Sequence, residues 1–134
     1  MAPIGLIIFD CDGVLVDSEP LAMRVLLKII ADSGVEIERS LAFRSYLGRS
    51  LASISESLER SHGAPLSETA LAAMREELYA LYRQELRPTP WLKPVLDGLD
   101  LPFCVASSSQ LERIRLSLEL TGTLDRFEPN IFSA

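Results

Sequence analysis

Hydrophobic positions change their period several times along the chain, and these changes mark the expected elements. Residues 4–9 (IGLIIF) form a nearly continuous apolar run that ends in acidic residues. Such a run is typical of a strand buried on both faces of a parallel sheet, so we expect Asp10 at the carboxyl end of a central strand. A second run from Phe103 to Ala106 and a third within "NIFSA" at 130–134 predict two further strands.

The long segment between the first two runs carries helical spacing. Apolar residues recur every three or four positions over 19–33, and similar spacing predicts helices over 40–46, 50–62 and 67–86. Ser18 and Ser67 are candidate N-caps, and Gly34 is a candidate stop signal. We expect His62 to be an exposed residue at a helix end.

Prolines then interrupt the helical pattern. The segment "RPTPWLKP" at 87–94 forbids a continuous helix, so we interpret it as a hinge with Trp91 as its packing anchor. A short helix over 95–99 is predicted before the second strand, and "QLERIRLSLELTG" predicts a helix that ends at Gly122.

This order of elements predicts an α/β fold, a Rossmann-like parallel sheet with a helical module inserted after the first strand. Ligands of such sheets bind at the carboxyl ends of the strands. Asp10 and Asp12 follow the first strand, while Ser107, Ser108 and Ser109 follow the second. Both clusters are therefore candidates for one site, although Ser109 is expected mainly to cap the next helix.

Charge and composition narrow the function classes. The formal net charge of −6 disfavours nucleic acids and anionic membranes as partners, because both require a basic surface. The N-terminal apolar run is too short to span a bilayer and does not resemble a secretion signal, so we predict a cytoplasmic protein. Cys11 and Cys104 adjoin apolar runs and are expected to be buried, reduced thiols.

The acidic cluster suggests chemistry at phosphorus. Keeping two carboxylates charged two residues apart requires a nearby cation or a shared proton, and an all-oxygen site suits Mg²⁺. With Mg²⁺ bound, one carboxylate can act as a nucleophile while its neighbour moves the proton. Gly13 would let the backbone turn sharply after them. A plain turn in which aspartates bond to nearby N–H groups is the alternative.

The residues themselves carry a resemblance to a known family. "FDCDGVLVDSEP" at 9–20 resembles the opening motif of the haloacid dehalogenase superfamily, in its branch of beta-phosphoglucomutase-like and phosphoglycolate phosphatase-like proteins. "CVASSS" at 104–109 is similar to the second motif of that family, and the helical insertion resembles its mobile cap. The resemblance implies an α/β core formed by residues 1–16 and 88–134, with a cap over 17–87.

The resemblance also implies roles for individual residues. Asp10 would be the nucleophile and a Mg²⁺ ligand through its carboxylate, and Asp12 the general acid and base and a ligand through its backbone carbonyl. Ser107, with the Ser108 backbone, would bind the phosphoryl group. "YLGRS" at 46–50 resembles the specificity loop of the cap, so Gly48, Arg49 and Ser50 would face the rest of the substrate. Asp17 and Ser18 are expected to be structural.

One departure from the family pattern affects the activity expected of these 134 residues. The family also uses a lysine after the third core strand and acidic residues after the fourth, and neither can be placed here. Lys28 and Lys93, the only lysines, lie in the insertion and the hinge. We therefore expect the sequence to be a fragment of a longer protein, truncated after the third core strand and with little turnover by itself.

The leading functional hypothesis is a Mg²⁺-dependent phosphatase that hydrolyses a small phosphorylated metabolite, of the sugar phosphate or phosphoglycolate type, through an aspartyl phosphate. A phosphomutase of the same family is the nearest alternative. A noncatalytic module that binds metal or phosphate is a third, and a dehalogenase is disfavoured because those relatives lack an acid at the position of Asp12. The sequence makes no prediction about the oligomeric state.

Overall fold

A computed structural model of the chain describes residues 2–134, which separate into two compact units. The first, here called the strand unit, comprises the residues up to Ser18 together with Leu81–Ala134. The second, the helical unit, is Glu19–Ala80. The predicted insertion, 17–87, begins two residues earlier and ends seven residues later than this unit, and the roles of core and cap remain predictions.

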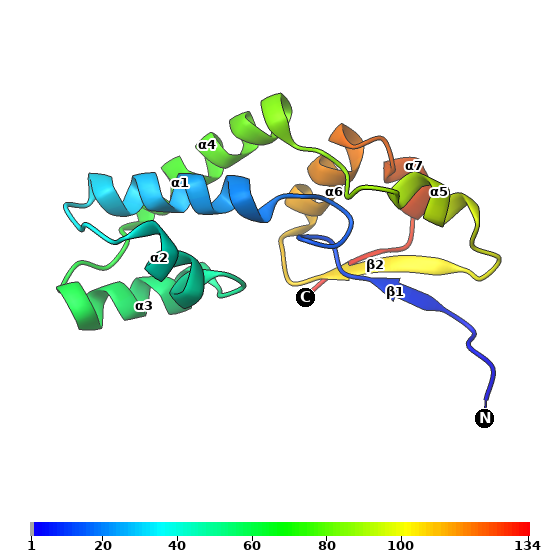
Figure 1. The fold of residues 1–134 in the computed structure, drawn as a ribbon, viewed down its shortest axis with the longest axis horizontal. Coiled ribbons are helices and arrows are strands. Elements are labelled where there is room, and N and C mark those ends of the chain that lie inside the picture. The colour runs from blue at the N-terminus through cyan, green and yellow to red at the C-terminus, as the bar shows by residue number, and fades with distance from the viewer. Residues whose placement is uncertain (1) are drawn as a thin grey trace. The chain divides into compact units, whose positions relative to one another are not determined.

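The strand unit is built on a parallel sheet of three strands in the order β1-β2-β3, of which β1 and β2 are labelled in Figure 1. They are β1 (Ile7–Phe9), β2 (Phe103–Ser107) and β3 (Ile131–Ser133). Phe9 is aligned with Val105, and Val105 with Ile131, so the carboxyl ends of the strands meet at one edge. The predicted α/β fold with a parallel sheet is confirmed.

Three helices of the strand unit lie on one side of this sheet in Figure 1: α5 (Leu92–Asp97), α6 (Leu111–Leu120) and α7 (Leu124–Phe127). The rings of Phe9 and Phe103 both meet the buried ring of Phe127 edge to face, with centroid distances of 6.0 and 5.2 Å. Leu118 on α6 is also fully buried. The hydrophobic core of the strand unit therefore lies between the sheet and these helices.

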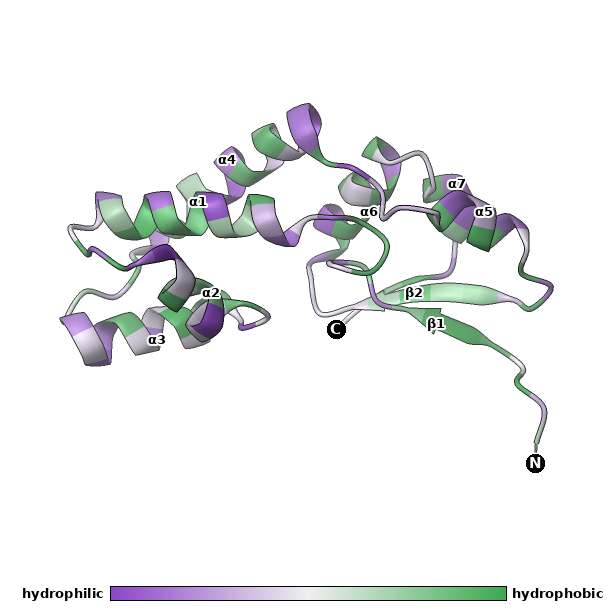
Figure 2. Ribbon diagram, in the orientation of Figure 1, coloured by the Kyte–Doolittle hydropathy of each residue, from purple (hydrophilic) through white to green (hydrophobic). Residues whose placement is uncertain are grey.

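The first strand differs from its prediction. β1 is shorter than the apolar run, lies at an edge of the sheet rather than at its centre, and is not buried on both faces. Ile4, Leu6 and Ile8 are 73%, 49% and 64% exposed, and Figure 2 shows the hydrophobic colour along β1. Burial on both faces requires cover that the described residues do not supply, because the helices α5 to α7 lie on one side only.

The helical unit holds α1 (Glu19–Asp32), α2 (Arg39–Tyr46), α3 (Leu51–His62) and α4 (Glu68–Glu85) up to Ala80. These four helices confirm the predicted ones to within about two residues at each end. Their apolar stripes are buried, for example Ile30, Ile54 and Met74. Hydroxyl groups begin two of the helices: Ser50 Oγ accepts from the Ser53 N–H, and Ser67 Oγ from the Ala70 N–H.

The region after the prolines was predicted less well. The expectation that Trp91 anchors the hinge is wrong, because its side chain is 79% exposed and its backbone is left-handed with φ of 68° just before α5. α5 starts at Leu92, earlier than predicted, since Pro94 is tolerated in the first turn of a helix. α7 was not predicted. In the described part of the chain, no helix is long and apolar enough to cross a membrane.

Candidate functional site

The loop after β1 is held by its own backbone. The carbonyl of Cys11 accepts from the N–H groups of Val14 and Leu15 at 3.1 and 2.9 Å. The Gly13 N–H donates to the Val16 carbonyl at 2.9 Å, and Gly13 has a φ of 74°, which a glycine adopts without strain. Leu15 and Val16 are fully buried and anchor the loop in the core. The two aspartates therefore lie on a fixed turn.

Asp10 directly follows β1, at the carboxyl end predicted for it, and its side chain is exposed. Its Oδ1 accepts from the N–H of Cys11 at 2.7 Å. No other group within the described residues 2–134 donates to this carboxylate. Oδ2 of Asp10 is thus available to a ligand or a substrate.

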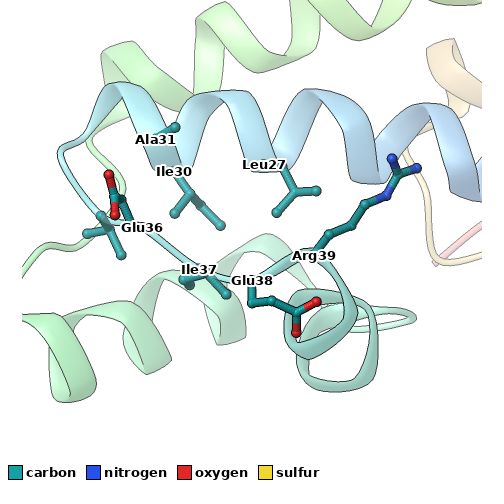
Figure 3. A pocket seen from close by; sticks show the side chains of 8 residues that line it. Leu27, Ile30, Ala31, Glu36, Ile37, Glu38 and Arg39 are labelled. Carbon is teal, nitrogen blue, oxygen red and sulfur yellow. The ribbon is translucent and has the colours of Figure 1, made fainter.

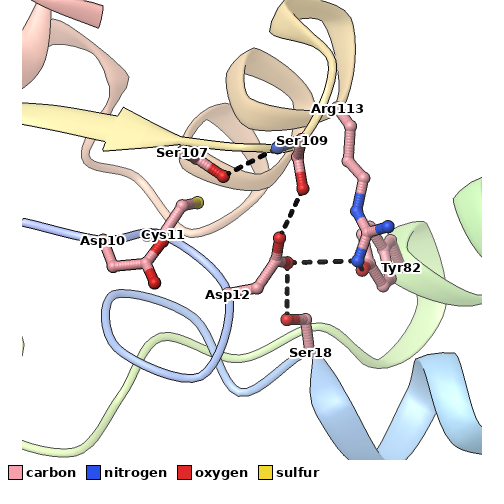
Figure 4. A network of polar contacts seen from close by, with 8 residues as sticks. All are labelled: Asp10, Cys11, Asp12, Ser18, Tyr82, Ser107, Ser109 and Arg113. Carbon is pink, nitrogen blue, oxygen red and sulfur yellow. Dashed lines mark hydrogen bonds and ion pairs between the residues drawn. The ribbon is translucent and has the colours of Figure 1, made fainter. Parts of the chain in front are cut away.

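Asp12 has three side-chain partners, toward which its carboxylate is turned (Figure 4). Oδ1 accepts from Ser18 Oγ at 2.7 Å and from Arg113 Nη2 at 3.2 Å, while Oδ2 accepts from Ser109 Oγ at 2.7 Å. All of these residues belong to the strand unit. The Asp12 carboxylate is oriented by groups from two segments of the chain: Ser18 just before α1, and the run from Ser109 into α6 that carries Arg113.

The serine cluster lies beside Asp12, at the end of β2. Ser107 is buried, and its Oγ accepts from the Ser109 N–H at 3.1 Å, whereas Ser108 is exposed. The expectation that Ser109 caps α6 is wrong: Gln110 precedes the helix without a side-chain cap, and the Ser109 hydroxyl donates to Asp12. Because α6 starts at Leu111, Gln110 rather than Ser109 occupies the cap position, and the Ser109 hydroxyl is placed to donate to the charged Asp12 carboxylate.

The other predicted residues, Gly48, Arg49 and Ser50, belong to the helical unit. Gly48 has a φ of 75° in the loop between α2 and α3, and Ser50 caps α3. The Arg49 guanidinium donates to the Ser45 carbonyl at 3.1 Å and to Ser53 Oγ at 2.6 Å. Arg49 is exposed, so these local bonds are open to exchange with a ligand.

A pocket of about 600 Å³ also lies in the helical unit, between α1 and the segment that leads into α2 (Figure 3). Apolar side chains such as Leu27, Ile30 and Ile37 line it together with Glu36, Glu38 and Arg39. The Glu38 carboxylate already caps α2 by accepting from the Ser40 and Leu41 N–H groups. None of the predicted site residues lines this pocket, and we do not include it in the candidate site.

Two residues near Asp12, Arg113 and Tyr82, were not identified from the sequence. Arg113 on α6 donates to Asp12, and its Nη2 also donates to the hydroxyl of the buried Tyr82 at 2.9 Å. Burial raises the pKa of Tyr82 to about 12. Burial lowers the pKa of Arg113, but Tyr82 and Asp12 outweigh that effect and hold it above its ordinary value. At any ordinary pH, Tyr82 is therefore uncharged and Arg113 is positively charged.

Cys11, between the two aspartates, is expected to be unreactive in the folded protein. Burial, and secondly the charge of Asp12, raise its pKa to about 12, and only the thiolate reacts rapidly with alkylating agents. At about pH 8, iodoacetamide should leave Cys11 unmodified until guanidinium unfolds the chain. Peptide mass spectrometry measures the modification, and alkylation of folded and unfolded chains at equal rates would contradict the expectation.

The oxygen donors here suit a hard cation only in part. The available Asp10 carboxylate and the Asp12 backbone carbonyl are ligand types that Mg²⁺ accepts, and Mg²⁺ commonly keeps several waters beside one or two carboxylates. The Asp12 side chain is already engaged by its three donors. Residues 2–134 contain no group of three or more His, Cys, Asp or Glu side chains that could enclose a metal. These residues would therefore supply two protein ligands to Mg²⁺, and water molecules would complete its coordination.

Comparisons with known proteins agree with the fold and with the motif. The chain is 28% identical to the 6-phosphogluconate phosphatase of Escherichia coli K12 over 99% of its own length and 61% of that protein. The solved structure of a haloacid dehalogenase-like protein of Agrobacterium tumefaciens superposes with a TM-score of 0.85 and 30% identity. The match covers 98% of this chain and 59% of the Agrobacterium protein.

A second solved structure, a haloacid dehalogenase-like hydrolase of Streptococcus pneumoniae, matches 98% of this chain and 61% of its own with a TM-score of 0.77 and 20% identity. The chain thus spans about 60% of the length of these proteins. Residues 7–133 match the family described as haloacid dehalogenase-like hydrolase. The chain belongs to the haloacid dehalogenase-like hydrolase family.

Proposed function

We propose that the natural protein containing this chain is a Mg²⁺-dependent phosphatase that hydrolyses a small phosphorylated metabolite through an aspartyl phosphate. The observation that carries the proposal is the pair at the end of β1. Asp10 is exposed with a carboxylate oxygen available, and Asp12, two residues on, is oriented beside the serines that end β2. One group is thus suited to attack and the other to proton transfer.

In the first step, an Asp10 oxygen forms a bond to phosphorus while the bond from phosphorus to the leaving oxygen breaks. Asp12, as the carboxylic acid, gives its proton to that leaving oxygen. In the second step, the Asp12 carboxylate accepts a proton from water as the water oxygen bonds to phosphorus and the bond from phosphorus to the Asp10 oxygen breaks. This sequence returns Asp10 as a carboxylate and Asp12 as an acid.

Ser107 is proposed to bind the phosphoryl oxygens. Its Oγ accepts from the Ser109 N–H, which leaves the hydroxyl proton of this buried residue for donation to a ligand. The backbone N–H of exposed Ser108 is proposed to lie beside it. Donors placed where negative charge gathers stabilise the transition state of phosphoryl transfer.

The Asp10 carboxylate and the Asp12 carbonyl would hold Mg²⁺. When bound, the ion would neutralise the phosphoryl oxygens and the crowded carboxylates, which is its usual role in phosphoryl transfer.

The substrate class is proposed to be a sugar phosphate or a related phosphorylated acid. The name of the Escherichia coli relative, 6-phosphogluconate phosphatase, supports this class. In the helical unit, Gly48, Arg49 and Ser50 are the proposed contacts to the rest of the substrate, because the exposed Arg49 guanidinium suits a carboxylate or phosphate group.

The proposal is tested with the natural gene product that contains residues 1–134, whatever its length. We expect it to release inorganic phosphate from 6-phosphogluconate, phosphoglycolate or p-nitrophenyl phosphate when Mg²⁺ is present. Excess EDTA should stop the release, and added Mg²⁺ should restore it. Isomerisation of a sugar phosphate without phosphate release would favour a phosphomutase, and inertness toward every ester would contradict the proposal.

A further inference from the structure

Arg113 is the only charged partner of the Asp12 carboxylate among the described residues. It is the third residue of α6, and its Nη2 donates to Asp12 Oδ1 at 3.2 Å and to the Tyr82 hydroxyl at 2.9 Å (Figure 4). The guanidinium carbon lies 5.7 Å from the centre of the Tyr82 ring. Tyr82 is 1% exposed, so the arginine is seated on a side chain that belongs to the core.

Local helix energetics do not explain this position. The first turn of a helix carries unpaired N–H groups and favours negative charge, so a cation in the first turn of α6 is unfavourable by itself. Both side chains of the Arg113–Asp12 pair are also largely withdrawn from water, at 26% and 23% exposure. In addition, Nε of Arg113 is buried with no partner among the described residues. These costs need a compensating interaction, and Asp12 supplies it.

Arg115, two residues along the same helix, provides the contrast. It pairs with Glu128 at 2.7 Å, and the two side chains are 48% and 32% exposed. A pair of this kind stabilises a protein by at most about 1 kcal/mol. Arg115 therefore behaves as an ordinary surface residue, whereas Arg113 makes a largely buried ion pair with the Asp12 carboxylate.

We propose that Arg113, seated on Tyr82, is a positioning residue for Asp12. This inference rests on the proposed function, in which Asp12 gives its proton to the leaving oxygen. Arg113 fixes Oδ1 together with Ser18, and Ser109 fixes Oδ2, so the carboxylate is confined to one orientation. Without the arginine, one charged contact is lost and the carboxyl group gains rotational freedom, which lowers the fraction of molecules aligned for proton transfer.

The test uses the natural gene product and two esters that differ in their need for an acid. 6-Phosphogluconate has an alkoxide leaving group that requires protonation, whereas p-nitrophenolate leaves with little help. Arg113→Met, which keeps the length of the aliphatic stem, should lower kcat/KM for 6-phosphogluconate by about 10- to 100-fold and for p-nitrophenyl phosphate by less than about 3-fold. Arg113→Lys should restore part of the loss, because it returns the charge.

Two further variants separate this effect from a general loss of structure. Tyr82→Phe removes only the hydroxyl and should give a smaller loss with the same dependence on the leaving group, so it replaces Arg113→Met if that variant does not fold. Arg115→Met, on the same helix, should match the wild type. Equal losses for the two esters in the folded Arg113 or Tyr82 variants, or no loss, would overturn the positioning role.

A different set of results would contradict the proposed function itself. If Asp10→Asn retained wild-type hydrolysis, or if no ester were hydrolysed at all, the aspartyl phosphate mechanism would be wrong, and the inference would fall with it. If Asp10→Asn were inactive while the Arg113 variants behaved like the wild type, only the positioning role would be overturned.

Discussion

Replacing Asp10 with asparagine is expected to abolish phosphate release by the natural gene product, with a loss of at least about 10³-fold in kcat. An amide oxygen is a far weaker nucleophile than a carboxylate oxygen, and it cannot form the aspartyl phosphate. The fold should be unaffected, because the Asp10 side chain is exposed and accepts only one hydrogen bond, from the Cys11 N–H. An asparagine carbonyl can still accept that bond.

The variant is measured on p-nitrophenyl phosphate and 6-phosphogluconate, and a phosphorylated form is sought at the same time. Brief mixing of the wild type with substrate followed by acid quench should leave an increase in mass of one phosphoryl group on the peptide that contains Asp10. Asp10→Asn should lack this adduct. Retained turnover by the variant, or an adduct on another residue, would refute the assignment of the nucleophile.

Asp100→Asn is a matched control for the change in charge. Asp100 is an exposed aspartate of the strand unit that precedes β2, so it lies at the opposite end of the strand from Ser107. The Asp100→Asn variant should retain activity within about 2-fold, since residue 100 lies at the end of β2 that is farther from the proposed site. Loss of activity in both variants would indicate an effect of net charge rather than of Asp10.

The sequence predicted what periodicity and short-range capping determine. The four helices of the helical unit were predicted because their apolar stripes are long, and the predicted cap Ser67 accepts from an N–H only three residues away. The placement of Asp10 at a strand end also followed from the apolar run before it. α7 was missed because four residues are too few to show a helical period. Trp91 was misjudged because a single residue carries no information about which face the chain turns outward.

The partners of Asp12 show a different limit. Arg113 lies 101 residues away in the sequence, and the docking of α6 against the loop after β1 decides the contact. One local signal was nevertheless present: a basic residue in the first turn of a predicted helix conflicts with the helix dipole. Conflicts of this kind between local preference and fold are expected at functional positions. Ser109 was misassigned as a cap for the same reason, since its acceptor comes from a distant segment.

Truncating Phe127 to alanine is expected to give the largest loss of stability in the strand unit, about 3–5 kcal/mol. Phe127 is fully buried, and its ring meets those of Phe9 and Phe103 edge to face. Removing the ring creates a cavity and eliminates its contacts with Phe9 and Phe103. Because a domain is commonly stable by only about 5–15 kcal/mol, much of the stability of the unit would be lost.

Native-state hydrogen exchange of the β2 amides measures this effect within the strand unit alone. The Val105 N–H, which donates to the Asn130 carbonyl at 3.1 Å, should lose protection in Phe127→Ala. Phe132→Ala is the matched control, since Phe132 is 56% exposed on β3 and its truncation should change stability by less than about 1 kcal/mol. Equal protection in the two variants would show that the aromatic cluster does not support the sheet.

The same cluster should also affect catalysis, because Phe9 immediately precedes Asp10. The milder change Phe127→Leu keeps the core filled but loses the edge-to-face contacts, which are worth about 0.5–1.5 kcal/mol each. We expect it to fold and to lower kcat on p-nitrophenyl phosphate by about 3- to 10-fold, because the end of β1 no longer holds Asp10 in one position. Unchanged kcat in a variant with measurably weaker β2 protection would show that Asp10 is positioned by its own loop and not by the core beneath it.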